Sequence, residues 1–380
     1  MSLKKIDVFI LFFMLSSFIV SCQNIEKTST KKTYEIKYLD EYVIQDDSIF
    51  KSSTIGGLSG IEYRAAENKY YIACDDPKSP RFYKASILIE NNSFLKITFD
   101  TVVKLKDSKH HFFTSSAVDI ESIRAFDKDT LIFSSEGSIK NNQDPSVFLT
   151  DSEGNYIDQL ILPSNFLADA SGQKNQPRHN KALEGLAKDI QGQGYWVAME
   201  GTLEQDGAMP TFTNTGAPIR ITHFDMASKK ADYQFTYPLD KIAKDPKDQF
   251  GVNGVTGIIQ LSQHQFLCIE RGYAAGYGSQ GNTVRIYLAN TEKATNTLNF
   301  LSLNDKRPVS ATKKLLFDLE SVRDQLTDRI VDNIEDITFG PTLSNGNQSL
   351  ILVSDNNFNP PSIQINQFIL LELIETLILE

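Results

Sequence analysis

A short pattern of hydrophobic and polar positions recurs five times along the chain. Each copy opens with an aliphatic residue, a polar or acidic residue, a small residue and a second aliphatic residue, and a later strand-like run ends in an acid. The openings begin at Leu58, Ile120, Leu183, Val255 and Ile334. The later runs end at Asp75-Asp76, Glu136, Glu200, Glu270 and Asp355. Self-similarity at a long period is typical of repeat architectures, so we predict five similar structural units.

Each copy contains short runs rich in Ile, Val, Tyr, Phe and Thr between Gly, Asn, Asp and Pro turns, which is typical of β-strands. The first copy predicts strands at 60–64, 69–74, 82–88 and 95–103. The fifth copy is one strand short, whereas residues 34–44 predict an N-terminal strand that belongs to no copy. We therefore predict an all-β fold, a β-propeller of four-stranded blades whose ring is closed by the N-terminal strand.

The number of blades is five by this count, and six stays open. The fourth and fifth copies begin at positions 255 and 334, and this interval has room for a small extra blade. A β-sandwich or two packed barrels would explain the strands but not the shared register of the acids. Helices should be few, with 321–330 the best candidate and 240–244 a weaker one.

The first 22 residues resemble a bacterial lipoprotein signal peptide. Two lysines precede the apolar run 8–20, and Ile19-Val20-Ser21-Cys22 resembles a lipobox, in which the cysteine becomes the lipidated first residue. An ordinary secretory signal or a hydrophobic anchor is the alternative. We predict lipidation at Cys22 and a domain held outside the cytoplasm at the bacterial cell envelope, with the lipid anchor as its only contact with the membrane.

The rest of the chain reads as one domain behind a tether. Residues 23–33 are polar and predict a flexible tether. Residues 34–371 contain no second linker and predict a single propeller domain, followed by a C-terminal tail at 372–380. We expect this domain to be a monomer.

Charge and cysteine content exclude some function classes. The 48 acidic and 38 basic residues give a net charge of −10, and no basic stripe is present, so we expect no nucleic-acid partner. Besides Cys22 only Cys74 and Cys268 remain, without a CxxC or Cys/His cluster, which argues against structural zinc. These two thiols could pair in an oxidising envelope or serve as small buried hydrophobic residues.

The register of the polar residues predicts a common site. In a propeller the first strand of each blade lines the central channel and the second runs antiparallel to it, so both recurrent positions meet at one face. The predicted inner ring is Ser59, Glu121, Glu184, Thr256 and Glu335. The predicted outer ring is Asp75, Asp76, Glu136, Glu200, Glu270 and Asp355, with Asn356 and Asn357 beside it. So many carboxylates need cations to balance them. Hard oxygen ligands without His or Cys favour Ca²⁺ over Mg²⁺ or Mn²⁺ and argue against zinc.

Two arginines suit the same site. Arg271 follows Glu270, and Arg178 lies shortly before Glu184. A guanidinium binds a phosphate or carboxylate through two parallel hydrogen bonds, and arginines beside metal ions form a phosphoryl-binding arrangement. Our assignment gives metal binding to Glu121, Glu184 and Glu335, catalysis to Glu200, Asp355 and Glu270, and substrate binding to Arg178, Arg271, Asn180 and Asn356.

Several of these residues have a structural interpretation as well. Acids at strand ends are often turn formers, and Glu–Arg pairs are often structural ion pairs. Ser59 lacks the GxSxG spacing of a nucleophile elbow, so we interpret it as a channel-lining hydroxyl or a turn residue. His179 is either a general acid or a surface residue of a loop.

Five segments of the chain resemble the phytase-like family of bacterial envelope proteins, which is described as having esterase-like phytase activity. The segments are 57–61, 178–187, 270–272, 333–337 and 354–358, and the resemblance covers nearly the whole mature chain. The chain departs from the family pattern at Ala182-Leu183, where Gly-Phe is commoner. The resemblance implies hydrolysis of phosphate esters.

Two functions from different classes follow. The first is a Ca²⁺-dependent hydrolase acting on a small phosphorylated or ester substrate, with a lactonase or carboxylester hydrolase as its nearest chemical variant. The second is a non-catalytic propeller whose acidic ring holds a structural ion and whose loops bind a polymer or a partner protein. An enzyme predicts an open cavity with Arg178 and Arg271 near the metal ligands, whereas a scaffold predicts these arginines buried in salt bridges.

Overall fold

A computed structural model describes residues 30–45, 48–114, 118–169, 171, 176–245, 247–304, 306–358 and 363–379. The predicted signal peptide, the lipidation site Cys22 and the first part of the tether lie outside these residues. The main unit, Tyr34–Glu375, is described by itself, and the described residues 30–33 and 376–379 lie outside it.

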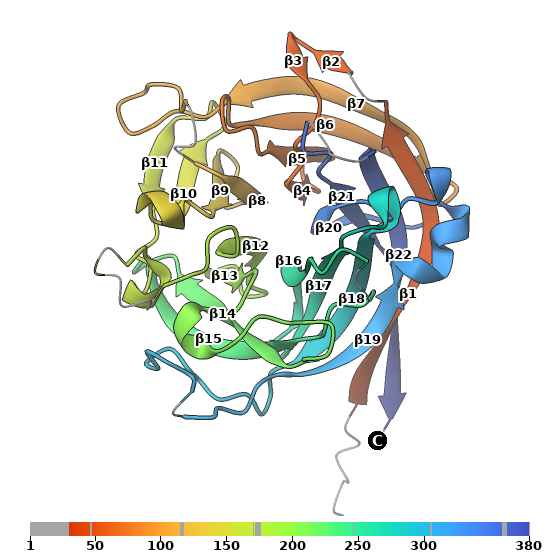
Figure 1. The fold of residues 1–380 in the computed structure, drawn as a ribbon. Coiled ribbons are helices and arrows are strands. Elements are labelled where there is room, and N and C mark those ends of the chain that lie inside the picture. Colours follow the sequence, from red (N-terminus) through yellow and green to blue (C-terminus); the bar gives the residue numbers. More distant parts are fainter. Residues whose placement is uncertain are drawn as a thin grey trace, which may run out of the picture. The chain divides into compact units, whose positions relative to one another are not determined.

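Five four-stranded antiparallel sheets form the blades of a β-propeller in Tyr34–Glu375 (Figure 1). From the inside outward, blade 1 is β4 (Gly60–Arg64), β5 (Lys69–Cys74), β6 (Arg81–Glu90) and β7 (Ser93–Lys104). Blade 2 is β8 (Ile120–Ala125), β9 (Thr130–Ser135), β10 (Ser146–Asp151) and β11 (Tyr156–Gln159). Blade 3 is β12 (Leu183–Lys188), β13 (Gly194–Met199), β14 (Ala217–Asp225) and β15 (Lys230–Leu239). Blade 4 is β16 (Gly251–Ser262), β17 (Gln265–Ala274), β18 (Asn282–Asn290) and β19 (Thr312–Asp318). A separate hairpin pairs β2 (Ile49–Phe50) with β3 (Ser53–Thr54).

The fifth blade confirms the predicted closure of the ring. Its strands are β20 (Ile334–Thr342), β21 (Gln348–Ser354), β22 (Asn366–Leu379) and, outermost, β1 (Thr30–Ile44). Tyr34 and Ile36 of β1 are buried in one cluster with Leu371 and Leu373 of β22. The N-terminal strand thus supplies the strand that the fifth copy lacks. β22 continues beyond position 371, through residues that we expected to form a tail.

The described residues between the fourth and fifth copies, all but 305, form no sixth blade. The middle part of this interval, 291–311, is a long connection between β18 and β19. Two short 3₁₀ helices follow, η5 (Leu319–Gln325) and η6 (Thr327–Arg329), where we predicted a helix at 321–330. The weaker candidate, 240–244, has no helix, so that prediction is wrong.

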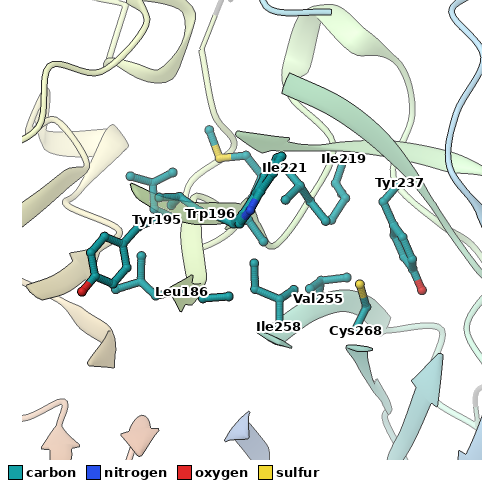
Figure 2. Close-up of a cluster of buried hydrophobic side chains, with 14 of the residues drawn as sticks. Leu186, Tyr195, Trp196, Ile219, Ile221, Tyr237, Val255, Ile258 and Cys268 are labelled. Carbon is teal, nitrogen blue, oxygen red and sulfur yellow. The ribbon is translucent and has the colours of Figure 1, made fainter. Parts of the chain in front are cut away.

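The hydrophobic core lies between neighbouring blades. Figure 2 shows one cluster, in which Trp196 of β13 and Ile221 of β14 lie near Val255 and Ile258 of β16. Every residue of β13 is buried, whereas the edge strand β7 alternates buried Ile97 and Phe99 with exposed residues. Middle strands are therefore covered on both faces and edge strands on one, as packing of blade against blade requires. Cys74 and Cys268 are both free thiols buried in this core, which answers the question left open from the sequence.

The centre of the ring is closed by a buried ion pair. Asp336 of β20 is fully buried and accepts hydrogen bonds from Arg124 Nη1 at 2.6 Å and Nη2 at 2.8 Å. It also accepts from the Ser122 hydroxyl and the Ile61 amide, both at 3.0 Å. These bonds join the inner strands β4, β8 and β20 near the axis. The same hydrogen bonds also fix where the carboxylates of Glu335 and Glu121 lie, because Asp336 follows Glu335 and Ser122 follows Glu121 in the chain.

Candidate functional site

The recurrent polar residue of the repeat occupies a β-bulge. In four of the five inner strands the pairing register shifts so that the inner strand carries one extra residue. The shifts fall at Glu121, at Glu184-Gly185, at Thr256 and at Glu335. A bulge takes a residue out of the regular ladder and re-aims its side chain, and bulges are common next to active sites. In these four copies the repeated opening is therefore the sequence of a bulge that takes the polar residue out of the regular ladder, whereas Ser59 of the first copy lies just before β4.

The small residue of each copy is required by close contact between blades. A Cβ on Gly60 would lie 2.8 Å from the backbone of Ser122, and one on Gly185 would lie 3.1 Å from the backbone of Ile258. Near the axis the inner strands approach so closely that larger side chains do not fit. The fifth copy has Asp336 at this position, and its carboxylate occupies the space that the small residues leave.

Five carboxylates gather around the polar positions of blades 1 to 3, and we call them the acidic cluster: Asp75, Asp119, Glu121, Glu136 and Glu184. Oxygen atoms of Glu121, Glu136 and Glu184 all lie within 4.8 Å of one another, and so do those of Asp75, Asp119 and Glu121. Glu121 belongs to both sets. The cluster therefore offers two overlapping groups of three oxygen ligands.

Two oxygens of the acidic cluster are buried without a hydrogen-bond partner among the described residues. They are Glu184 Oε2 and Asp75 Oδ1, and the nearby Ser59 hydroxyl is in the same condition. Glu184 is only 4% exposed. An unpaired buried carboxylate oxygen is costly, which a divalent cation bound by these oxygens would relieve. The donor set consists of hard oxygens without His or Cys, so it fits Ca²⁺.

Burial and mutual repulsion raise the pKa values of these carboxyls. Burial raises the pKa of Glu136 to about 8, with a further rise from the charge of Glu200. The pKa values of Glu121 and Glu184 are raised well above the usual range, first by burial and then by neighbouring carboxylates. Like charges in a buried site behave in this way when no cation balances them.

Two basic side chains lie next to the acidic cluster. Lys181 Nζ is 2.6 Å from Glu200 Oε2. Arg271 Nη2 is 3.4 Å from Glu200 Oε1 and 3.2 Å from Glu335 Oε2, while its Nε is buried without a partner among the described residues. Glu335 and Glu200 are thus paired with bases and lie outside the two groups of three oxygens.

Asp355 lies on the blade-5 side of this arrangement. Its Oδ1 accepts a hydrogen bond from the Asn357 amide at 2.6 Å. Burial raises the pKa of Asp355 to about 7, with a further rise from the charge of Glu335. A carboxyl with this pKa can accept or donate a proton near neutral pH.

Four of the residues assigned from the sequence do not belong to the acidic cluster. Arg178 donates to the backbone carbonyls of Thr202 at 3.1 Å and Gly207 at 2.8 Å, so it holds a loop. Asn180 is exposed in a turn. Asn356 accepts from the Gly57 amide at 3.1 Å and joins blade 5 to blade 1.

Glu270 is the fourth sequence-assigned residue outside the acidic cluster, and the orientation of its side chain follows from strand geometry. β17 continues to Ala274, whereas β9 and β13 end one residue before their acids. Glu270 therefore stays in the strand and points to the side opposite Arg271. There it accepts from the Tyr237 hydroxyl at 2.8 Å and from Asn253 Nδ2 at 2.7 Å, and it pairs with Lys313.

The sequence interpretation missed Asp119 and Lys181 as site residues. Asp119 stands two positions before Glu121, so an extended backbone places both side chains on one side. That spacing was the available signal.

Among the described residues, no helix has the length and apolar character needed to span a membrane.

Comparison with known proteins gives one family match. A family model described as Phytase-like, esterase-like activity of phytase, matches residues 53–358. A search of curated proteins found no match. Among solved structures, the chain is similar to a putative glycoside hydrolase from Parabacteroides distasonis, at 9% identity and a TM-score of 0.44 over 83% of this chain and 86% of that one. It is also similar to a PQQ-bound aldose sugar dehydrogenase from Streptomyces coelicolor, at 9% identity and a TM-score of 0.39 over 91% of this chain and 100% of that one. Similarities at this level carry no argument about function.

Proposed function

The chain belongs to the phytase-like family, and from this premise we propose that it is a Ca²⁺-dependent hydrolase of phosphate esters. The observation that carries the proposal is the acidic cluster with its unpaired, buried Glu184 oxygen, adjacent to an arginine. Carboxylates of this kind bind hard cations, and the family description points to ester hydrolysis. Magnesium or manganese is a less suitable occupant, because the cluster is rich in carboxylates.

The residues of the acidic cluster would hold the ion. Bound there, Ca²⁺ would balance the carboxylates and polarise the oxygens of a water molecule or of the ester. Of the three metal ligands assigned from the sequence, Glu121 and Glu184 keep that role. Glu335 instead orients Arg271, because the two form an ion pair at 3.2 Å.

Arg271 and Asp355 would act on the substrate. Arg271, whose Nη2 is held by Glu200 and Glu335, would donate to a phosphate oxygen. Asp355, with a pKa of about 7, would take the proton of the attacking water. The water oxygen forms a bond to phosphorus, the bond from phosphorus to the alcohol oxygen breaks, and that oxygen takes up a proton.

Hydrolysis can be tested with bis(4-nitrophenyl) phosphate and 4-nitrophenyl phosphate. The mature domain is first stripped with a chelator, and Ca²⁺ is then added back. Glu184→Gln keeps the shape of the side chain and removes its charge, and Glu153→Gln, at an exposed turn position, is the matched control. We expect Ca²⁺ to restore turnover, and Glu184→Gln to lower it by at least about 10- to 100-fold, the loss seen when support of a metal site is removed. Glu153→Gln should behave as the unmodified chain does.

The alternative function is a non-catalytic propeller, and one observation favours it. Arg271 is paired with Glu200 and Glu335, as a structural role for this arginine predicts. If Ca²⁺ raises the melting temperature but none of these esters is hydrolysed, the acidic cluster is a structural ion site. The loops around it would then bind a polymer or a partner protein.

We also propose that the protein is a monomeric lipoprotein of the bacterial cell envelope, anchored through Cys22 and without a nucleic-acid partner. The basis is the lipobox-like segment 19–22 and the net charge of −10. Replacing Cys22 by Ala should move the protein from the membrane fraction to the soluble fraction. An unchanged distribution would contradict anchoring by lipid.

A further inference from the structure

A cavity of about 450 Å³ lined by polar and apolar residues lies between blades 4 and 5, next to Arg271. Blade 4 contributes Arg271, Tyr273 and Asn282 to its lining. The segments that flank β20 and β21 contribute Asn333, Asn357 and Gln364. Neither the family description nor the acidic cluster accounts for this cavity.

One wall of the cavity is an extension of blade 4. β16 begins at Gly251, well before its bulge at Thr256, and pairs Val252 with Tyr273 and Gly254 with Arg271. β18 extends the wall by pairing Asn282 with Tyr273. Because side chains alternate along a strand, Arg271 and Tyr273 point to the same side. The wall therefore presents a guanidinium and a phenol together.

The cavity and the acidic site share residues. Arg271 lines the cavity and is 3.2 Å from Glu335. Asn333 lines it too, and its side-chain amide donates to the other oxygen of Glu335. A ligand in the cavity would thus contact the same arginine that faces the carboxylates.

The lining has one charge and many neutral hydrogen-bonding groups. Arg271 is its only charged residue among the described residues, and its other polar side chains are amides and hydroxyls. Asn282 and Asn333 are each 8% exposed, so they are held in place by packing. Amides and hydroxyls both donate and accept, as the hydroxyl groups of a sugar or polyol do.

We propose that this cavity selects a phosphodiester with a single negative charge and an uncharged, hydroxyl-rich body, and disfavours substrates that carry several phosphates. The inference rests on the proposed function and specifies its substrate. Arg271 is the one cation among the described lining residues, so it offers a guanidinium for one phosphodiester group and none for a second phosphate. Additional phosphates would lie in the cavity without a cation and near the acidic cluster, and burying an unpaired charge is costly.

A matched pair of substrates tests the charge argument. Glycerophosphoinositol and glycerophosphoinositol 4,5-bisphosphate contain the same diester and differ by two phosphates. We expect the Ca²⁺-loaded domain to hydrolyse the first with a kcat/KM at least about 10-fold higher. Equal or faster hydrolysis of the bisphosphate would overturn the proposal.

A double variant tests the cavity itself. Tyr273→Phe with Gln364→Leu removes two hydrogen-bonding groups and keeps the side-chain size. Because two hydrogen bonds to the substrate are lost, kcat/KM for glycerophosphoinositol should fall by about 10- to 100-fold, mainly through KM. The fall should be smaller for bis(4-nitrophenyl) phosphate, which has no hydroxyl groups. An equal fall for both esters would overturn the proposal. Gln263→Leu, at the exposed turn between β16 and β17, is the control that should change neither value.

Calorimetric titration with glycerophosphoinositol separates this inference from the proposed function. If no ester is hydrolysed but the compound binds, and the double variant weakens binding by about 10-fold or more, the hydrolase proposal fails and the cavity inference stands. If the compound is neither hydrolysed nor bound, the cavity inference fails as well. If the two inositol compounds are hydrolysed equally well, the hydrolase proposal stands and only the proposed substrate class is contradicted.

Discussion

Asp336 shows how one residue of a repeat takes a different role from its counterparts. The other copies have Gly60, Ser122, Gly185 and Gly257 at this position, where blades meet closely. Asp336 places a carboxylate at the axis and pairs it with Arg124. The pair anchors three inner strands and the bulges next to them, so it supports the site without belonging to it.

Substitution of Asp336 tests this structural role. Asp336→Asn keeps the volume but removes the closest carboxylate of the buried Arg124 and leaves it only Glu62, whose Oε2 is 4.0 Å from Arg124 Nε. Removing one partner of a buried ion pair typically costs about 3–5 kcal/mol. We expect urea unfolding to show a loss of this size. Asp324→Asn is the control, because the Asp324–Arg329 pair is exposed, and its effect should stay within about 0.5 kcal/mol. A small effect of Asp336→Asn would show that the ion pair does not hold the ring together.

The sequence predicted the acidic residues better than their partners. The recurrent polar positions of blades 2 and 3 and the acids after β5 and β9 were recognisable because they repeat in register, and the structure brings them together. The positions of Glu270 and Arg178 were not recognisable in this way. Glu270 depends on how far β17 continues, and Arg178 depends on backbone carbonyls of a loop. Neither dependence leaves a periodic signal in the sequence.

Strand β1 is the element on which closure of the ring depends. It is the outermost strand of blade 5 and lies beside β22. Its side chains also reach other elements, since Glu41 accepts from the Thr327 amide and Asp40 accepts from the Phe94 amide, both at 2.7 Å. The two ends of the chain therefore complete one blade together.

A pair of neighbouring substitutions tests this closure. Ile36 is buried against β22 and Lys37 is exposed. If β1 completes the blade, Ile36→Ala should cost about 2–5 kcal/mol in the free energy of unfolding, as other buried Ile→Ala changes do. Lys37→Ala should cost less than about 0.5 kcal/mol. Similar small effects from both would contradict a packed N-terminal strand.

The elements that the sequence did not predict are those without periodicity. The strands follow a pattern that repeats in every copy, and the missing strand of the fifth copy indicated the role of β1. The extension of β16 and β17 beyond the bulge, and the connection 291–311, occur in one blade only. The extension of β16 and β17 forms one wall of the proposed cavity, so this part of the site had no repeat to indicate it.

At the scale of the whole molecule, the carboxyl groups make stability dependent on pH. Burial raises the pKa values of Glu136 to about 8, Asp355 to about 7 and Glu62 to about 6. Between their unfolded and folded pKa values these groups bind more protons in the folded chain than in the unfolded one. The folded state therefore loses stability as the pH rises from about 5 to about 8. Burial lowers the pKa of His179, and this shift makes the folded state more stable as the pH rises. His179 is a single group, whereas several carboxyls act in the other direction.

The melting temperature measured in chelator should accordingly fall as the pH is raised from 5 to 8. Saturating Ca²⁺ should reduce this dependence, because the cation balances the same carboxylates that protons balance at low pH. A melting temperature in chelator that rises over this range would contradict the assignment of raised pKa values to the buried carboxyls.

Calorimetric titration of Ca²⁺ into the chelator-stripped domain at pH 8 measures whether the acidic cluster binds a cation. Glu121 belongs to both groups of oxygen ligands, so Glu121→Gln is the critical variant and Glu153→Gln the control. The account predicts saturable Ca²⁺ binding that Glu121→Gln weakens by at least about 10-fold and Glu153→Gln leaves unchanged. No saturable binding by the unmodified domain, or equal affinity in Glu121→Gln, would contradict a cation site in the acidic cluster.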